Sequence, residues 1–177
     1  MIIKNAKIED AKAIKIIMFN HNISRNSKKQ TGLIEYHLPS ENELKNRLKN
    51  NPFFYVIEDE GKIVGFLSAY KDDLLKKLNF SEDEIVRHIL KKQQPFIYGD
   101  LIVIEKEYQN KGIGKLLLER LIKDSENYTI YGPISHYPHR NDLSIKLLIS
   151  FGFKLIEEIN VYNGLIFGIY KKGGVGT

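Results

Sequence analysis

The sequence predicts a single α/β domain of the α+β type, with about seven strands interspersed with helices along 177 residues. Apolar runs of strand length alternate with segments in which apolar residues recur at helical spacing, and capping or turn signals separate them. A chain of 20.5 kDa is also long enough to bury a sizeable core without disulfides or metals. We expect the domain to cover residues 1–171 and residues 172–177 to form a disordered tail.

The first half of the chain should contain a strand, two helices and a hairpin. Ser40 and Glu43 have the spacing of a capping box, which marks a helix start, and Gly65 suits a bulge within a strand. Residues 20–38 are polar and should be irregular. The expected elements are a strand at residues 2–3, helices over residues 8–19 and 40–49, and hairpin strands over residues 53–58 and 62–70.

The second half should begin with a helical insertion over residues 71–95, between the third and fourth strands. Ser81 and Glu84 form a second capping box within this insertion. Near the end of the chain, Asn163-Gly164 predicts a two-residue hairpin turn. The remaining expected elements are strands over residues 96–104, 128–134, 153–161 and 165–170, and helices over residues 112–124 and 141–150.

The composition excludes several classes of protein. Cysteine is absent, which rules out a disulfide scaffold, a thiolate zinc site and a cysteine nucleophile, and which fits a reducing cytoplasm. The N-terminal residues contain no continuous apolar segment of a signal peptide, and no stretch approaches the roughly 20 apolar residues of a membrane span. We therefore expect a soluble, unprocessed cytoplasmic protein that does not bind membranes.

The charge balance favours an anionic ligand. Lys and Arg number 27 against 22 Asp and Glu, which gives a net charge of +5. Nucleic acid is the rival interpretation of this charge. The lysines are spread over several predicted helices, and no nucleic-acid motif or segment combining basic residues with stacking aromatics is present, so we expect no nucleic-acid partner.

The most informative segment joins the end of an apolar strand to the start of an apolar helix. A helix N-terminus carries unpaired N–H groups and the positive end of the macrodipole, so its amides bind phosphate well. Gly112 and Gly114 lack the Cβ atoms that would hold a phosphate away, and they permit positive φ. Lys111 and Lys115 add positive charge. The apolar stripe of the following helix is expected to consist of Leu116, Leu117, Leu118, Leu121 and Ile122.

Two common phosphate loops do not fit these residues. A Walker A loop needs Ser or Thr after its lysine, but Leu116 follows Lys115. A dinucleotide fingerprint needs a third glycine, and Leu117 occupies that position.

The segment instead resembles the acyl-CoA signature of the GNAT superfamily of N-acetyltransferases. In that signature, Arg or Gln is followed by two residues, Gly, one residue, and Gly or Ala, and Gln109, Gly112 and Gly114 match it. A second motif of the family is Asn, two residues, and Ala or Ser, followed by a helix that ends in Gly-Phe. Asn141-Asp142-Leu143-Ser144 and Phe151-Gly152-Phe153 resemble it. The predicted order of elements also resembles the GNAT topology over nearly the whole chain, apart from the insertion.

The resemblance implies a GNAT fold, with a central mixed, mostly antiparallel sheet flanked by helices. It also implies acetyl-CoA as co-substrate, with no metal. In the family, the sheet splays between the strand that ends at Ile104 and the strand that starts near Tyr128. The pantetheine arm lies in this opening and pairs with the freed backbone groups, one of which faces the thioester oxygen. An extra residue before Gln109 would move these contacts from residues 102–104 to residues 101–103. The implied cofactor-binding residues are Ile102, Val103, Ile104, Gln109, Asn110, Lys111, Gly112, Ile113, Gly114, Lys115 and Asn141. On local physics alone, Asn141 is a helix cap.

Acetyl transfer to an amine needs a group that accepts a proton and a group that protonates the departing thiolate. Many GNAT relatives use a tyrosine seven residues after the motif asparagine, but Leu148 occupies that position here. Substitute candidates are Tyr98 and Asp100, which share a strand face by alternation, and three residues expected in the loop before Asn141: His136, Tyr137 and His139. We place Asp100 and Tyr137 first as catalytic candidates. A water molecule is a further substitute, and strand packing or loop exposure is the alternative role for each residue.

Three functions follow as alternatives. The first is an N-acetyltransferase that transfers an acetyl group from acetyl-CoA to a primary amine by direct transfer in a ternary complex. Its acceptor is a small-molecule amine or a protein amine, and a homodimer is one compatible assembly. The second is a non-catalytic CoA-binding or regulatory module, which the loss of the usual tyrosine permits. The third is a nucleic-acid-binding domain, which would show steeply salt-dependent binding.

Overall fold

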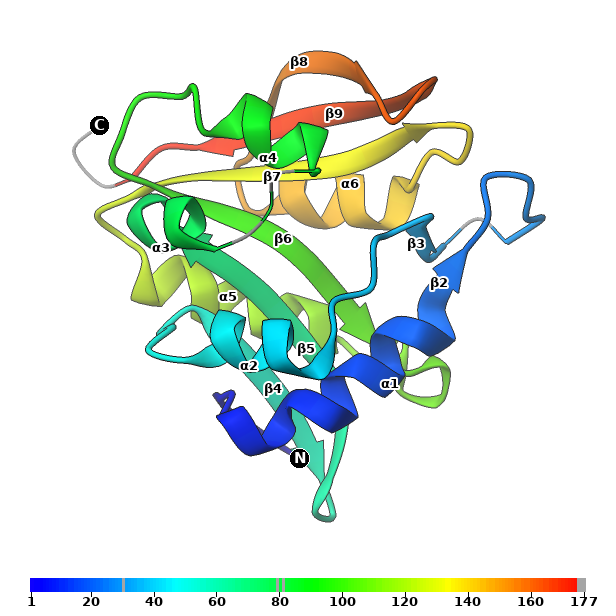
Figure 1. Ribbon diagram of the computed structural model, residues 1–177, viewed down its shortest axis with the longest axis vertical. Helices are drawn as coiled ribbons and strands as arrows, with labels where there is room; N and C mark the ends of the chain where they lie inside the picture. Colours follow the sequence, from blue (N-terminus) through cyan, green and yellow to red (C-terminus); the bar gives the residue numbers. More distant parts are fainter. Residues whose placement is uncertain (30, 79, 81, 175–177) are drawn as a thin grey trace. The chain divides into compact units, whose positions relative to one another are not determined.

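The computed structural model describes residues 1–174 except residues 30, 79 and 81. Seven strands form one sheet in the order β1-β4-β5-β6-β7-β9-β8, and the two-residue strands β2 and β3 pair with each other (Figure 1). The seven-stranded, mostly antiparallel sheet with flanking helices confirms the predicted fold class. The chain divides into two compact units, one of Met1–Ala69 with Leu101–Asp124 and the other of Tyr70–Asp100 with the chain from Ser125 onward.

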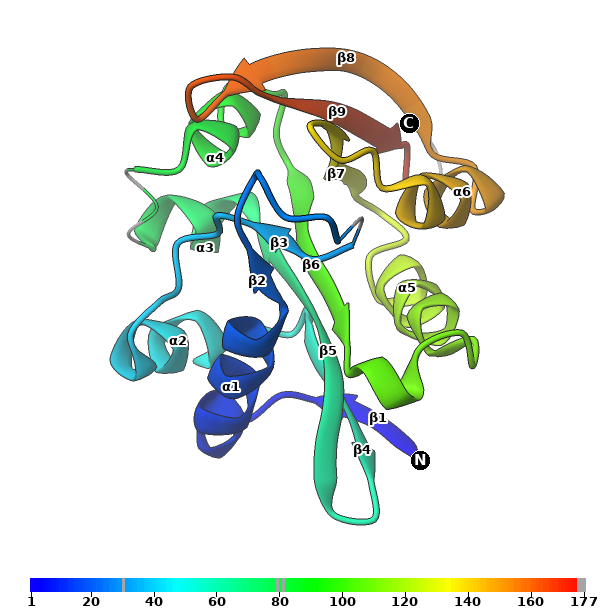
Figure 2. The ribbon, with the colours of Figure 1, turned by 90° about the vertical axis from the view of Figure 1, so that its right-hand side faces the viewer.

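The first unit contains an antiparallel sheet with helices on both faces. In Figures 1 and 2, α1 and α2 cover one face of β4 and β5, and α5 covers the other. The expected first helix begins as a short 3-10 helix at Ile8–Asp10 before the α-helix proper. The elements are β1 (Ile2–Asn5), α1 (Ala11–His21), β2 (Asn22–Ile23), β3 (Leu33–Ile34), α2 (Glu41–Leu48), β4 (Phe54–Asp59), β5 (Lys62–Lys71) and α5 (Ile113–Asp124). The last two residues of β5, Tyr70 and Lys71, belong to the second unit.

The capping box predicted at the start of α2 is present in the structure. Ser40 Oγ accepts a hydrogen bond from Glu43 N at 3.1 Å, and Glu43 Oε2 accepts one from Ser40 N at 2.6 Å, which completes the capping box of α2. One expectation was wrong: the side chain of Leu116 is 47% exposed, although we placed it in the apolar stripe of α5. The buried side of α5 consists of Ile113, Leu117, Leu118 and Leu121.

Gly65 sits at the predicted bulge of β5. Ile57 pairs with Gly65 while the next residue, Glu58, pairs with Ile63, so β5 holds one extra residue there. A Cβ on Gly65 would lie 2.9 Å from Val103 O and from Ile104 Cδ1. The glycine therefore lets the last residues of β6 pass close to the backbone of β5.

The second unit contains the insertion, the parallel strand pair and the C-terminal hairpin. Helices α4 and α6 lie on opposite faces of the β7-β9-β8 sheet (Figures 1 and 2). Strand β6 begins in this unit, and its residues from Leu101 onward belong to the first unit. The elements are α3 (Asp72–Lys77), α4 (Glu84–Ile89), β6 (Phe96–Ile104), β7 (Thr129–Tyr137), α6 (Asp142–Ser150), β8 (Lys154–Val161) and β9 (Leu165–Lys172).

Helix α4 begins with a cap other than the expected one. Asp83 Oδ1 accepts a hydrogen bond from Val86 N at 3.0 Å, so Asp83 is the N-cap residue. The predicted cap, Ser81, lies outside the described residues. A carboxylate at the start of a helix also interacts favourably with the macrodipole.

The C-terminal hairpin has a longer turn than predicted. Val161 pairs with Leu165, so the loop holds three residues and not two. Tyr162, Asn163 and Gly164 all have positive φ, at 49°, 55° and 106°. Contacts of Tyr162 with α4, described below, hold this tyrosine in a conformation that the Asn-Gly signal alone does not specify.

Strand β6 pairs with β7 over a short distance. The two strands are parallel, and their register consists of Phe96 with Thr129, Ile97 with Ile130, and Tyr98 with Tyr131. The register ends at Tyr98, and Gly99 and Asp100 follow it on β6 in the same unit. Strand β7 itself runs three residues beyond its expected end at Ile134.

Two further expectations concern the C-terminal tail and membrane-spanning helices. Strand β9 includes Lys172, and residues 175–177 of the expected tail lie outside the described residues. Within the described part of the chain, no helix combines the length and apolar character that crossing a bilayer requires.

The close approach of β6 to Gly65 predicts that a side chain at this position lowers the stability of the fold. Gly65→Ala should lower the free energy of unfolding by about 1–3 kcal/mol, because the added methyl group collides with backbone and must displace β6. Urea unfolding measures this loss. Gly99→Ala is the matched control, since its Cβ would meet Tyr131 O at an ordinary 3.5 Å. Equal stability losses for the two variants would contradict the prediction.

Candidate functional site

The predicted anion-binding loop forms an open turn in the first unit. Strand β6 leads into a 3-10 helix at Lys106–Tyr108, and Asn110 and Gly112 then adopt positive φ, at 61° and 77°. The first backbone hydrogen bond of α5 runs from Leu116 N to Gly112 O at 3.2 Å. The amides of residues 112–115 precede that bond, and within the described residues none of them has a backbone acceptor.

The surface of this loop is accessible. A Cβ on Gly112 would have no heavy atom within 4 Å, and Lys111 and Gly112 are exposed. Lys111 Nζ lies 5.2 Å from the centre of the Tyr108 ring, and Lys115 Nζ lies 3.9 Å from Glu119 Oε1. Lys111 is therefore held beside the loop, whereas Lys115 pairs with Glu119 one turn further along α5 and is 63% exposed. Exposed cations near the start of a helix suit an anionic ligand.

The side chain of Gln109 is hydrogen-bonded within the chain, unlike a side chain that is free to bind phosphate. Its Nε2 donates a hydrogen bond to Ile104 O at 2.9 Å, which closes the loop onto the end of β6. This bond brings two predicted cofactor-binding residues together. It also makes the side chain of Gln109 a brace of the loop, because one of its two amide N–H groups is used within the chain.

The predicted cofactor strand differs in exposure along its length. Ile102 is 36% exposed and Val103 is 5% exposed, whereas Ile104 is half-buried. The side chain of Val103 therefore packs in the core. Backbone groups of the same strand are independent of that packing, so these residues can fill the core with their side chains and still pair with a cofactor through their main chain.

Asp100 and Tyr98 lie on one face of β6 in the second unit, as their alternation predicted. Tyr98 Oη donates a hydrogen bond to Asp100 Oδ1 at 3.4 Å, and the tyrosine is 1% exposed. Asp100 is half-buried. The carboxylate is thus oriented by a buried hydroxyl, and the carboxylate is the more accessible member of the pair.

Tyr137 and His136 belong to β7 and not to the loop in which we expected them. Tyr137 is 58% exposed and pairs with Ile166 of β9, and His136 sits at a register shift between Ser135 and Tyr137. The exposed phenol leaves Tyr137 free to contact a ligand. The strand extends this far because β9 offers pairing partners up to that point.

The side chain of His136 is only 4% exposed and lies between two partners. Its Nδ1 contacts Glu158 Oε1, and its Nε2 lies 3.0 Å from Tyr170 Oη. A Cβ on Gly168 would lie 2.4 Å from the imidazole ring, so the ring occupies space that this glycine leaves open. His136 is therefore part of the packing of β7, β8 and β9.

His139 lies in the turn that leads to α6. Ser135 Oγ donates a hydrogen bond to His139 O at 2.8 Å, and Asn141 N donates one to Ser135 O at 3.0 Å. The Nε2 atom of His139 is buried and has no hydrogen-bond partner in the described part of the chain. Among the described residues, no group of three or more His, Cys, Asp and Glu side chains has the geometry of a metal site.

Asn141 caps α6, as local physics predicted. Its Oδ1 accepts a hydrogen bond from Ser144 N at 3.1 Å. Leu148, at the position of the usual family tyrosine, is 6% exposed, and its Cδ1 lies 3.6 Å from where a Cβ on Gly132 would be. Leu148 thus fills core space over β7 and supplies no hydroxyl.

Sequence reasoning missed a cluster around Tyr162. Tyr162 Oη donates to Asp83 Oδ1, Tyr162 N donates to Glu84 Oε2 at 2.8 Å, and Ile85 N donates to Tyr162 Oη at 3.4 Å. Burial raises the pKa of the Tyr162 phenol well above its ordinary value, and the charges of Asp83 and Asp100 raise it further. The one signal of this cluster in the sequence is Asp83, a residue type that caps helices.

The structure assigns the predicted residues to both units. The loop and residues 101–104 belong to the first unit, whereas Asp100, Tyr137 and Asn141 belong to the second.

The sequence model of the acetyltransferase (GNAT) family matches residues 20–153. Solved structures with a similar fold include Arabidopsis thaliana Naa50 in complex with the bisubstrate analogue CoA-Ac-MVNAL, at 13% identity and a TM-score of 0.66, with 97% of each chain covered. Salmonella typhimurium yncA, solved with its cofactor acetyl-CoA, has 17% identity and a TM-score of 0.65 over 98% of this chain and 93% of that chain. A ribosomal-protein-alanine N-acetyltransferase from Brucella melitensis has 20% identity and a TM-score of 0.65 over 97% and 99%.

The Tyr162 cluster makes a pH-dependent prediction. Tyr162→Phe should lower the free energy of unfolding by about 1–3 kcal/mol at neutral pH, because Asp83 and Ile85 N lose a buried partner. The folded pKa is raised, so the stabilisation by the phenol is fully present below its ordinary pKa of 10.0 and is lost as pH rises through the folded pKa. Urea unfolding of both proteins from neutral pH to about pH 11 should show their difference shrinking at alkaline pH. A difference that does not change with pH would exclude this account.

Proposed function

The chain belongs to the acetyltransferase (GNAT) family, and we propose that it transfers an acetyl group from acetyl-CoA directly to a primary amine in a ternary complex. The observation that carries this proposal is the open loop before α5, where Gly112 has positive φ and no atom near the position of a Cβ. A diphosphate can approach the backbone amides there without meeting a side chain.

Acetyl-CoA supplies the activated acetyl group, and the loop would hold its diphosphate. In this proposal the amides of residues 110–115 surround the phosphates, and Lys111 and Lys115 add charge. Gln109 acts through its bond to Ile104 O, which fixes the loop relative to β6. Backbone groups of residues 102–104, or of residues 101–103 in the alternative register, would pair with the pantetheine arm, and Asn141 would contact CoA.

The acceptor that we propose is the amine of a peptide or protein, with small-molecule amines as the second class. Two similar structures support this choice. One was solved with an analogue that joins CoA to a peptide, and the other is named as acting on an alanine of a ribosomal protein. Within the described residues, the accessible carboxylate of Asp100 provides a group that can attract an ammonium ion.

The chemistry requires that the acceptor lose a proton before its nitrogen attacks the thioester. We propose that Asp100 accepts this proton, directly or through one water molecule, because Tyr98 orients its carboxylate. The departing thiolate needs a proton in turn, and Leu148 cannot donate one. We assign this role to the phenol of Tyr137, which is 58% exposed, whereas Tyr98, the other tyrosine among the candidates, is 1% exposed.

Gly112→Ala tests the cofactor loop. The affinity for CoA should fall by about tenfold or more, since the methyl group would stand where the diphosphate approaches and one lost contact of about 1.4 kcal/mol corresponds to tenfold. Isothermal titration calorimetry with CoA measures the change.

Gly61→Ala is the matched control for this variant. Gly61 has a φ of 80° and no atom within 4 Å of a Cβ, so it carries the same backbone strain in the turn between β4 and β5. Both variants should lose similar stability, and CoA affinity should fall for Gly112→Ala alone. Unchanged CoA affinity in the Gly112 variant would refute the loop assignment.

Asp100→Asn tests the proton acceptor. Release of free thiol from acetyl-CoA with a panel of amines and peptides should slow by about 100-fold or more, which is the usual contribution of a general base. The affinity for CoA should stay the same. Asp73→Asn is the control, because the Asp73 side chain is 60% exposed in the same unit. Equal rates for Asp100→Asn and the wild type would remove Asp100 from the mechanism.

The second candidate function is a non-catalytic CoA-binding or regulatory module, which Leu148 favours because it replaces the usual hydroxyl with a buried alkyl group. The same assays separate the two functions. Binding of CoA without thiol release for any amine in the panel would support the module.

A further inference from the structure

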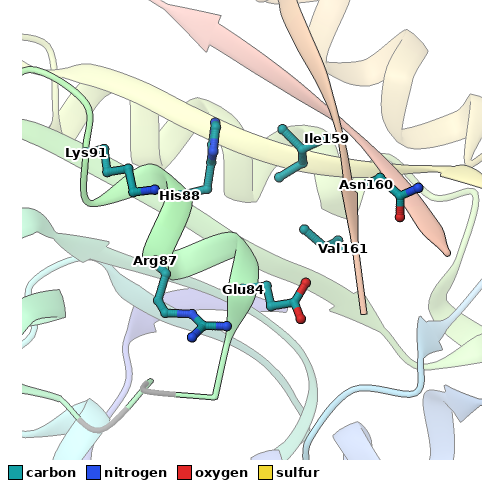
Figure 3. Close-up of a pocket in the computed structure, with 7 residues that line it drawn as sticks. All are labelled: Glu84, Arg87, His88, Lys91, Ile159, Asn160 and Val161. Atoms are coloured by element: carbon teal, nitrogen blue, oxygen red, sulfur yellow. The ribbon is translucent and has the colours of Figure 1, made fainter. Parts of the chain in front are cut away.

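A groove separates α4 from β8 in the second unit. It encloses about 550 Å³ and is open to solvent. Figure 3 shows the residues that line it. Pockets of this size accommodate several residues of a peptide or one small organic molecule. The residues that line it are Glu84, Arg87, His88, Lys91, Ile159, Asn160 and Val161.

The groove has a charged wall and an apolar wall. Glu84, Arg87, His88 and Lys91 recur at the spacing that places helical residues on one face, with Lys91 in the turn that follows α4. Ile159 and Val161 extend from β8 toward α4, and Asn160 extends to the other side of the strand (Figure 3).

Two positive charges on the charged wall are available for a ligand. Lys92 and His88 are already occupied, because both contact Glu157 Oε1. Arg87 and Lys91 are exposed, and within the described residues neither forms an ion pair. A ligand that reaches this end of the groove therefore meets uncompensated positive charge.

The opposite end of the groove is negative. Glu84 accepts the hydrogen bond of Tyr162 N, and Asp83 contacts the hydroxyl of the same tyrosine. The groove is thus polarised, with carboxylates at the Glu84 end and cations at the Lys91 end.

Strand β8, which forms one wall of the groove, is also an edge strand of the sheet in the part of the chain that the structure describes. Strand β8 is the last strand of the sheet and pairs with β9 on one side. An edge strand offers its free N–H and C=O groups to an extended peptide, whose alternate side chains then point toward the helix.

We propose that this groove binds the acceptor as an extended peptide, with the free amine toward Glu84 and acidic side chains against Arg87 and Lys91. The proposal rests on the proposed function and specifies its substrate class as peptides with acidic residues downstream of the amine. An acidic segment matches the cationic end, and the ammonium group matches the carboxylate end.

Binding to defined peptides tests the proposal. Three fluorescent peptides share a free N-terminal alanine and their length, and carry glutamate, glutamine or lysine at the same downstream positions. Fluorescence anisotropy of the full chain saturated with CoA should show about fivefold tighter binding of the glutamate peptide than of the glutamine peptide, as two partly exposed ion pairs allow. The preference should decline in about 1 M salt, where charges are screened beyond about 3 Å.

A charge reversal gives the sharper test. The double variant Arg87→Glu/Lys91→Glu should invert the preference, so that the lysine peptide binds about fivefold tighter than the glutamate peptide. The control is Lys146→Glu/Lys154→Glu, which makes the same change of charge at two exposed lysines of the same unit outside the groove. This control should keep the preference of the wild type.

Two results would overturn the proposal: no preference for the glutamate peptide in the wild type, or equal loss of preference in both double variants. Failure of the proposed function is distinguishable from either, because it appears as absence of CoA binding in calorimetry or of thiol release, whereas peptide binding is measured independently.

Discussion

The short pairing between β6 and β7 is the constraint on which the rest of this structure depends. Their register covers three residue pairs, although β6 continues to Ile104 and β7 to Tyr137. Buried backbone N–H and C=O groups need partners, and a strand that leaves its neighbour early must find them elsewhere. Under the proposed function, the amide-bearing arm of acetyl-CoA is that partner. The candidate residues Asp100, residues 102–104 and Tyr137 all lie beyond the last shared pair.

Features that depend on neighbours in sequence could be predicted from the sequence. The capping box of α2, the bulge at Gly65 and the cap at Asn141 each involve residues a few positions apart or a single conformational requirement, and the structure has all three. Strand β6 occupies the predicted residues 96–104 for the same reason, since its apolar run is bounded by clear signals. The order of these predicted helices and strands is what indicates the fold class.

Features that depend on distant residues could not be predicted in this way. His136 contacts Glu158 and Tyr170, which lie 22 and 34 positions away, and its ring fits only because position 168 is a glycine. No local pattern contains this information, so the histidine was expected in an exposed loop. The turn at Tyr162 differs from the two-residue prediction for a similar reason, because its contacts with α4 span almost 80 positions. Asp83 and Glu84 belong to the Tyr162 cluster because of those contacts.

The attachment of Tyr162 to the start of α4 has a consequence for how this domain can vary. Both carboxylates that hold the hairpin tip come from a segment inserted between β5 and β6, so the tip has no such support in a chain that lacks the insertion. A left-handed tyrosine would then be an unfavourable residue at that position. Transplanting the β8-β9 turn into a relative without this insertion should therefore require a shorter loop or a glycine in place of Tyr162, and the two segments are best exchanged as one cassette.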